Sequence, residues 1–237
     1  MLGNSYLSRI FAEDELRQQI VELNNKQINT PLISVTQCDI DLTHNEDKIQ
    51  VGARLILKNN TTEIINRYIF TLNPGLDVQS VKSGQNELKF TRDIHLLTVE
   101  PANSLSTQSL DSLTIKYGGV IDERICYLDV DETTKAERKK SGMLTIDKRF
   151  AFVSPAYVLL TPESYWYPVA GVGYSSDFPG LHAQQFVQFN LNVTTEKDLF
   201  AIAQGKAIEQ TNGSFSFRSE FPIPQLSLAI GKYEKRE

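Results

Sequence analysis

Histidine and cysteine are scarce in this chain, and their scarcity limits the chemistry that it can carry. The 237 residues include 3 histidines (His44, His95 and His182) and 2 cysteines (Cys38 and Cys126). A catalytic zinc usually takes three protein ligands. The sequence has no H-E-x-x-H motif and no pair of histidines four residues apart. A zinc site within this chain is therefore not predicted.

The local context of these residues favours structural roles. We expect His44 to be an exposed turn residue, His95 to be a surface or a satisfied core residue, and His182 to lie in a polar loop. Neither cysteine belongs to a C-x-x-C pair, and cysteine is often buried. Two buried free thiols are favoured, although a disulfide stays open. No local motif supports Cys126 and His182 as a nucleophile pair.

Other catalytic and binding signatures are also missing. A G-x-S-x-G elbow is absent, and no helical pattern follows Gly171-Val172-Gly173. The acidic run at 129–132 lacks the glycine and later glutamate of a calcium loop. The basic run at 135–140 is diluted by acids, and both runs predict solvated loops. With a net charge of -5, nucleic acid is not an expected partner.

Long apolar runs are absent as well. No stretch of about 18 apolar residues occurs, so the sequence predicts no membrane-spanning helix. The first residues lack the basic and apolar regions of a signal peptide, and none is expected in this fragment.

Helical periodicity is confined to the first part of the chain. Apolar residues from Tyr6 to Leu23 recur at helical spacings in a polar background, which predicts a helix over about residues 5–25. Asn24, Asn25 and Pro31 then end it. Residues 1–30 are accordingly interpreted as a helical linker segment, and residues 31–237 as the main domain.

After Pro31 the apolar residues alternate with a period of two, which is typical of strands. One strand is predicted around 33–42, with one irregular step, and a second around 51–57, joined by a turn at 44–47. Further strands are predicted at 64–72, 76–81, 87–91, 94–99, 109–117, 186–193, 201–203 and 226–231. The run 150–160 contains Pro155, which confines it to a sheet edge or breaks it in two. Short strands with turns between them predict a mainly β fold, a β-sandwich or saddle-like antiparallel sheets with an N-terminal helix.

The segment Tyr165-Trp166-Tyr167-Pro168 is the most unusual local feature. Large rings beside a proline could form a platform for a peptide or a glycan. They could also fill a corner of the core or a domain interface, because tyrosine and tryptophan bury much area and keep a polar tip. Core packing is favoured. The platform hypothesis requires the rings to be exposed in a cleft.

The order of several motifs resembles aminopeptidase-N-like zinc metallopeptidases. A strand ending in Tyr117-Gly118-Gly119 comes first, followed by a run from Thr161 to Val169. That run is similar to the segment before the aromatic-Pro-Cys corner of the family, with Val169 in place of cysteine. The strands 185–193 and 228–234 resemble the next strand and the strand that precedes the catalytic domain. The similarity covers roughly residues 30–234.

This resemblance implies the N-terminal β domain of a larger peptidase, with no catalytic residue and no metal site of its own. Zinc would belong to a catalytic domain absent from this chain, and that domain would be the partner of the β domain. The runs Leu160-Thr161-Pro162-Glu163 and Trp166-Tyr167-Pro168 are similar to a bacterial group fused to an ABC transporter permease. The parent would then be membrane-bound, with this domain on the extracytoplasmic side, and the parent could equally be an inactive homologue.

The resemblance also suggests where substrate would be touched. In active relatives an acidic residue or a glutamine of this domain helps hold the substrate amino terminus, and Glu163 is the candidate here. Tyr165, Trp166 and Tyr167 complete the candidate substrate-binding set. The alternative function is a self-standing peptide- or glycan-binding module built on the three rings.

Overall fold

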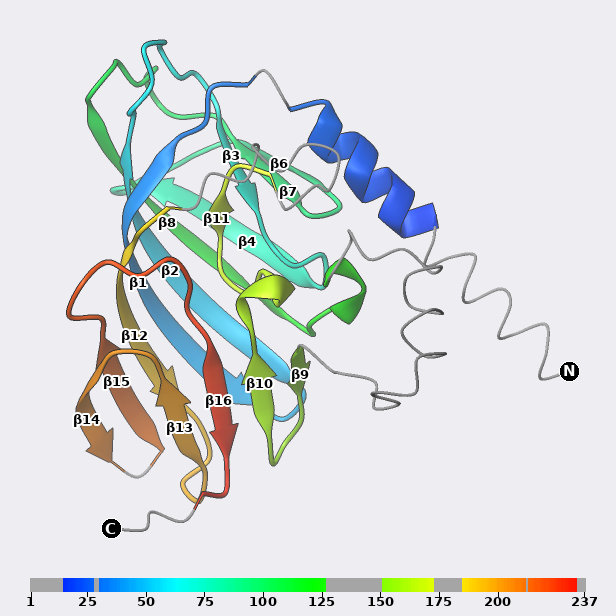
Figure 1. The fold of residues 1–237 in the computed structure, drawn as a ribbon, viewed down its shortest axis with the longest axis vertical. Helices are drawn as coiled ribbons and strands as arrows, with labels where there is room; N and C mark the ends of the chain where they lie inside the picture. Colours follow the sequence, from blue (N-terminus) through cyan, green and yellow to red (C-terminus); the bar gives the residue numbers. More distant parts are fainter. Residues whose placement is uncertain (1–14, 28–29, 127–150, 173–184, 212, 234–237) are drawn as a thin grey trace, which may run out of the picture.

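The computed structural model describes residues 15–27, 30–126, 151–172, 185–211 and 213–233. Within these residues the chain forms three β-sheets with a helix at residues 15–25 beside them (Figure 1). The prediction of a mainly β fold with antiparallel sheets and an N-terminal helix is confirmed. None of the helices in these ranges is both long and apolar enough to cross a membrane.

The largest sheet has eight strands in the described residues. Its central hairpin is formed by β1 (Ser34–Asn45) and β2 (Lys48–Lys58), which meet at the tight turn Glu46-Asp47, where Glu46 has a φ of 55°. β1 also pairs in parallel with β12 (Gln188–Thr194). Across the sheet the strands are, in order, β14 (Lys206–Thr211), β15 (Ser214–Arg218), β12 (Gln188–Thr194), β1 (Ser34–Asn45), β2 (Lys48–Lys58), β8 (Leu110–Gly119), β4 (Leu76–Ser83) and β5 (Asn86–Glu87).

Two four-stranded sheets complete the β structure, and we name them after one strand of each. The β10 sheet contains, in order, β13 (Phe200–Ala203), β16 (Leu228–Gly231), β10 (Val158–Leu160) and β9 (Ala151–Val153). The β3 sheet contains β11 (Val169–Ala170), β3 (Tyr68–Thr71), β7 (Leu96–Val99) and β6 (Phe90–Asp93). Short 3-10 helices, η1 (Glu123–Ile125) and η2 (Pro162–Ser164), lie in the connections.

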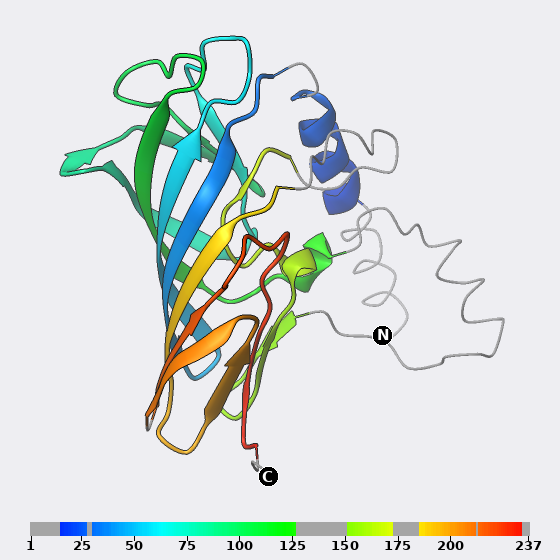
Figure 2. The same cartoon turned by 60° about the vertical axis from the view of Figure 1, so that its left-hand side comes forward.

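The alternation of buried and exposed residues along the strands determines where the core lies. In β2 the buried residues are Ile49, Val51, Ala53, Leu55 and Leu57, and their neighbours point to the other face. Alternate residues of a strand face opposite sides of a sheet, so one face of the large sheet is apolar. Figure 2 shows the β10 sheet facing that side, and the main apolar cluster fills the space between the sheets.

Local irregularities of the sequence correspond to irregularities of the sheets. The irregular step after Val35 is a β-bulge, because the register of β1 on β2 shifts between Val35 and Gln37. Pro155 lies in the turn between β9 and β10, so the predicted break of that run is confirmed. The helix predicted at 5–25 is helical at 15–25, and its first part lies outside the described residues.

Candidate functional site

Glu163 lies on the one-turn helix η2, directly after strand β10. Thr161 is the residue before this turn, Pro162 is its first residue, and Tyr165 ends it in the left-handed region with a φ of 49°. Proline suits the first helical position because its missing N–H would have no partner there. The Ser164 hydroxyl donates to the Thr161 carbonyl at 2.7 Å. The turn thereby holds a half-buried carboxylate at the end of a strand.

Asn73 fixes the position of this turn. Its fully buried side chain donates from Nδ2 to the carbonyl oxygens of Ser164 at 2.7 Å and Asp122 at 3.0 Å. Its Oδ1 accepts from the backbone N–H groups of Gly75 at 2.9 Å and Asp122 at 2.8 Å, and its own N–H donates to the Tyr165 carbonyl at 2.8 Å. One amide therefore joins the β3–β4 corner, the start of η1 and the end of η2.

The connection after β8 brings further acidic groups toward η2. Asp122 accepts hydrogen bonds from the Arg124 side chain, the shortest of them 2.6 Å from Nη2. Burial opposes ionisation of Asp122, but the hydrogen bonds and charge of Arg124 outweigh it and lower the pKa of the carboxyl group. Asp122 is thus an ionised carboxylate that is paired with Arg124.

Both cysteines are free and buried, as expected. Burial raises the pKa of the Cys126 thiol to about 12, with the negative charges of Glu123, Glu163 and Asp122 adding to the effect. Burial also raises the pKa of Cys38, and Asp39 adds to it. Thiolate is the nucleophilic form, so neither thiol is prepared for nucleophilic attack. His182, the other member of the nucleophile pair that no local motif supports, lies outside the described residues.

The aromatic segment packs inward. Trp166 is fully buried and donates from Nε1 to the Leu226 carbonyl at 3.2 Å. The Tyr167 hydroxyl accepts from the Leu226 N–H at 3.2 Å, and its ring meets Trp166 and Phe189 edge to face at 5.0 and 5.4 Å. Tyr165 is also buried. In this geometry the rings form core and corner packing, and the indole offers no face to a ligand.

The histidines of the described residues are both buried. His44 is in β1, not in an exposed turn, and that prediction is wrong. Its Nδ1 lies 2.9 Å from the Thr195 hydroxyl, and its Nε2 lies 2.9 Å from the Glu46 carbonyl and 3.0 Å from the Ser154 carbonyl. The side chain is buried because the pairing of β1 extends through Asn45, farther than the apolar pattern indicated.

His95 is a core histidine that is satisfied at one nitrogen only. Its Nε2 lies 2.7 Å from the Asn24 Oδ1 atom, and its buried Nδ1 has no hydrogen-bond partner in the part of the chain that the structure describes. Burial, together with the nearby charge of Arg92, lowers the pKa of His95 to about 3. The imidazole is therefore neutral at ordinary pH, and Nε2 carries the proton that it donates to Asn24.

No set of three or more potential ligands that could hold a metal ion occurs within the ranges that the structure describes. The runs at 129–132 and 135–140 lie outside those ranges. Sequence patterns missed Asn73, the residue that organises the corner. Its signal was Asn73-Pro74-Gly75, which predicts a turn but does not reveal the segments that the amide joins.

Comparison with known proteins identifies the fold. No family model matches the chain, and no curated protein matches it either. Among solved structures, an M1 zinc metallopeptidase from Deinococcus radiodurans superposes with a TM-score of 0.62 and 18% identity, over 84% of this chain and 42% of that one. Legionella pneumophila aminopeptidase A in complex with aspartic acid gives 0.58 and 11%, over 85% and 22%.

Yeast LTA4 hydrolase in complex with bestatin gives a TM-score of 0.55 and 15% identity, over 86% of this chain and 29% of that one. The chain thus spans less than half the length of each of these proteins. Its fold is the fold of one part of the M1 zinc peptidases to which it is similar.

Proposed function

We propose that this chain is a non-catalytic accessory domain of a larger aminopeptidase-like protein, and that it packs against a catalytic-like domain of the same parent and walls its cleft. The observation that carries the proposal is the outward face of the β10 sheet. Register places Ile202, Ala229, Leu159 and Phe152 in one row across its four strands. All four residues are apolar.

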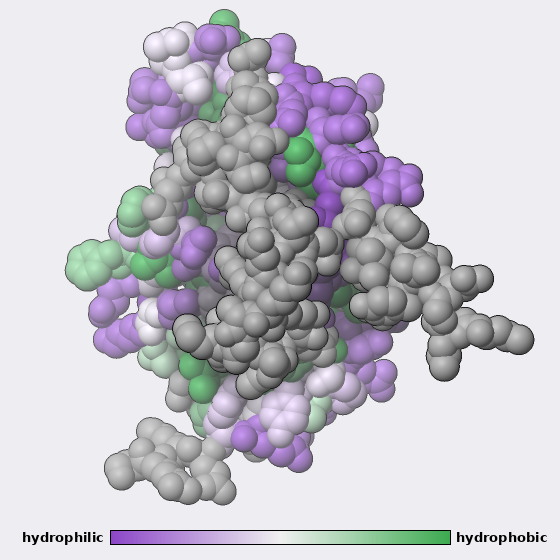
Figure 3. All heavy atoms as spheres, turned by 45° about the vertical axis from the view of Figure 1, so that its right-hand side comes forward, coloured by the Kyte–Doolittle hydropathy of each residue, from purple (hydrophilic) through white to green (hydrophobic). Residues whose placement is uncertain are grey.

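This row lies on the face opposite to the core. The neighbouring residues Ala201, Ile230 and Val158 are buried, whereas Ile202 is 50% exposed. Tyr157 at the end of the same face is 52% exposed. In Figure 3 apolar side chains occur in small groups among polar ones on the face of the molecule in view. An outward sheet face of this composition is typical of an interface.

The outer face of the eight-stranded sheet gives the contrast. There the side chains of Asp41, Asn192 and Ser216 form a ladder, with Asn192 Nδ2 donating to Asp41 Oδ1 at 2.7 Å and Ser216 Oγ donating to Asn192 Oδ1 at 2.8 Å. Such a face is suited to water. Of these two outward faces in the described residues, the row on the β10 sheet is apolar and the ladder on the eight-stranded sheet is polar.

Two further features support a catalytic-like domain as the occupant. Tyr233, at the end of the described residues, follows β16 and lies at the apolar face, since a Cβ on Gly231 would be 3.4 Å from its ring. β10 is a strand of this same sheet, and it leads into the η2 turn that carries Glu163. An interface on the β10 sheet would therefore bring Glu163 to the rim of the partner, where we propose that it contacts the substrate amino terminus.

The finer assignment rests on sequence resemblance alone. We propose a bacterial parent fused to an ABC transporter permease and bound to a membrane, with residues 1–30 as the linker and residues 31–237 as the extracytoplasmic β domain. The runs around Glu163 and Trp166 support it. A self-standing peptide- or glycan-binding module finds no support in the described residues, because the three rings are buried.

Binding of this chain to the separately produced downstream part of its parent tests the proposal. We expect Ile202→Glu to weaken the complex at least tenfold by calorimetry, because an introduced charge would be buried at an apolar contact. The matched control, Ser216→Glu on the outer face of the large sheet, should bind like the wild type. Equal affinity of the two variants would show that the apolar face is not the interface.

A peptidase assay with zinc on the isolated chain and on the joined parent is the second measurement. We expect activity only in the joined form if the parent is active, and Glu163→Gln should then raise KM. Activity of the isolated chain would overturn the accessory-domain proposal. A silent parent with an intact complex would indicate an inactive homologue.

A further inference from the structure

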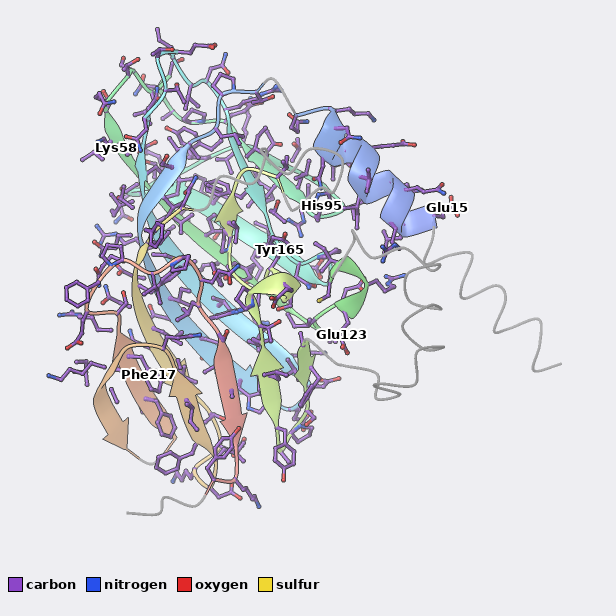
Figure 4. All side chains as sticks on the ribbon, viewed as in Figure 1. Glu15, Lys58, His95, Glu123, Tyr165 and Phe217 are labelled. Atoms are coloured by element: carbon purple, nitrogen blue, oxygen red, sulfur yellow. The ribbon has the colours of Figure 1, made fainter. Side chains whose placement is uncertain are left out.

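The helix at residues 15–25 docks through small apolar clusters that are separate from the main core. Ile20 is fully buried against Ile125, Cys126 and Tyr165, and Leu16 packs on the same cluster. One turn later, Leu23 packs against the separate cluster of Ile69, Leu96 and Val172. The labelled Tyr165, Glu123 and His95 lie on the side of the sheets that the helix covers (Figure 4). These clusters are small beside the main one.

Two of the four non-glycine residues with positive φ in the described part of the chain lie where the helix docks. Ile94 has a φ of 50° and Tyr165 a φ of 49°, and both side chains contact the Ile20 cluster. A β-branched residue at positive φ is a conformational outlier. Such conformations persist where surrounding contacts hold them. The docked helix supplies part of those contacts.

The polar contact between the helix and the sheets is incomplete. Asn24 and His95 are both fully buried and share one hydrogen bond of 2.7 Å, whereas Asn24 Nδ2 and His95 Nδ1 have no partner among the described residues. A buried polar atom without a partner loses the hydrogen bond that it made with water. Undocking of the helix would return both atoms to water. The hydrogen bonds regained there would offset part of the free energy lost with the apolar contacts.

We propose that the helix is a detachable strap, which when docked covers Cys126 and holds the Tyr165 corner, and which can release while the three sheets stay folded. Release exposes the Cys126 thiol and lets the 162–165 turn relax. Docking of the helix therefore affects the position of Glu163, which lies two residues from Tyr165 in this turn. The proposal concerns this chain alone and does not depend on the accessory-domain function. Separate local opening of a weakly packed element is a general property of folded proteins.

The two thiols provide the test, because they lie in different clusters. Cys126 is covered by the strap, whereas Cys38 is part of the main core. We would label the folded chain with N-ethylmaleimide at pH 8 and follow each cysteine by peptide mass spectrometry. In the wild type we expect Cys126 to react at least tenfold faster than Cys38, since only global unfolding exposes Cys38.

Substitutions in the strap should then change one rate and not the other. Ile20→Ala removes apolar contact to Cys126 and is expected to speed Cys126 labelling at least tenfold, with Cys38 unchanged. Asn24→Ala is the second, milder variant, and Gln18→Ala on the exposed side of the helix is the control that should match the wild type. Equal rates for both cysteines in the wild type, or equal acceleration of both in Ile20→Ala and Asn24→Ala, would overturn the strap. So would labelling of Cys126 that neither variant accelerates.

Discussion

Replacement of Asn73 by alanine should be among the most destabilising single changes in this protein. The substitution removes four side-chain hydrogen bonds, to Ser164, Asp122 (two) and Gly75. Each such bond contributes about 0.5–1.5 kcal/mol net, and buried groups left unpaired add to the loss. We therefore expect a loss of about 3–5 kcal/mol in the free energy of unfolding.

Urea denaturation followed by circular dichroism measures this loss. With a slope of about 2–3 kcal/mol per molar urea, the midpoint of Asn73→Ala should fall by about 1–2 M. The matched control is Asn60→Ala, because the Asn60 side chain is exposed, and its effect should stay within about 0.5 kcal/mol. A loss below about 1 kcal/mol in Asn73→Ala would refute the reasoning, since it would mean that the corner holds without the amide.

Three further outcomes are expected. His95 has a pKa of about 3 in the folded chain, below its ordinary value, so unfolding takes up a proton below about pH 6.5. Its neutral imidazole therefore contributes fully to the free energy of unfolding above that pH, and this contribution is lost as the pH falls toward about 3. In urea titrations at different pH values, His95→Gln should make the free energy of unfolding depend less on pH in this acid range. Trp166→Ala should cost about 3–5 kcal/mol in the same assay, because it empties a fully buried site. Gly75→Ala should lower the midpoint, since the added Cβ would lie 2.0 Å from the Val120 carbonyl oxygen. Gly52→Ala should not, because its added Cβ would meet no atom of the described residues within 4 Å.

The strands were predictable because their signal is local. Alternation of apolar and polar residues reports which face of a sheet is buried, and it located β1, β2, β8 and β12 closely. The bulge after Val35 and the break at Pro155 were readable for the same reason, as each is a departure from the local pattern. His44 was misplaced because a polar residue at the end of a strand is buried by partners distant in sequence, here Thr195 and Ser154.

The candidate site was predictable only in part. The run from Thr161 to Pro168 was noticed for its composition, but composition did not decide whether Trp166 faces solvent or the core. That choice depends on Leu226, whose backbone pairs with Trp166 and Tyr167 from another part of the chain. Glu163 as a substrate contact stays a prediction.

The sequence by itself determined the β class, most strand positions, the scarcity of metal ligands and the expected free thiols, because these depend on residue type and short-range periodicity. The tertiary structure decided the pairing of β1 with β12, the joining of three segments by Asn73, and the docking of the helix on Cys126. It also decided that the β10 sheet turns an apolar row outward. These features arise from contacts between residues far apart in the chain, and a local pattern carries no information on which distant segment will complete it.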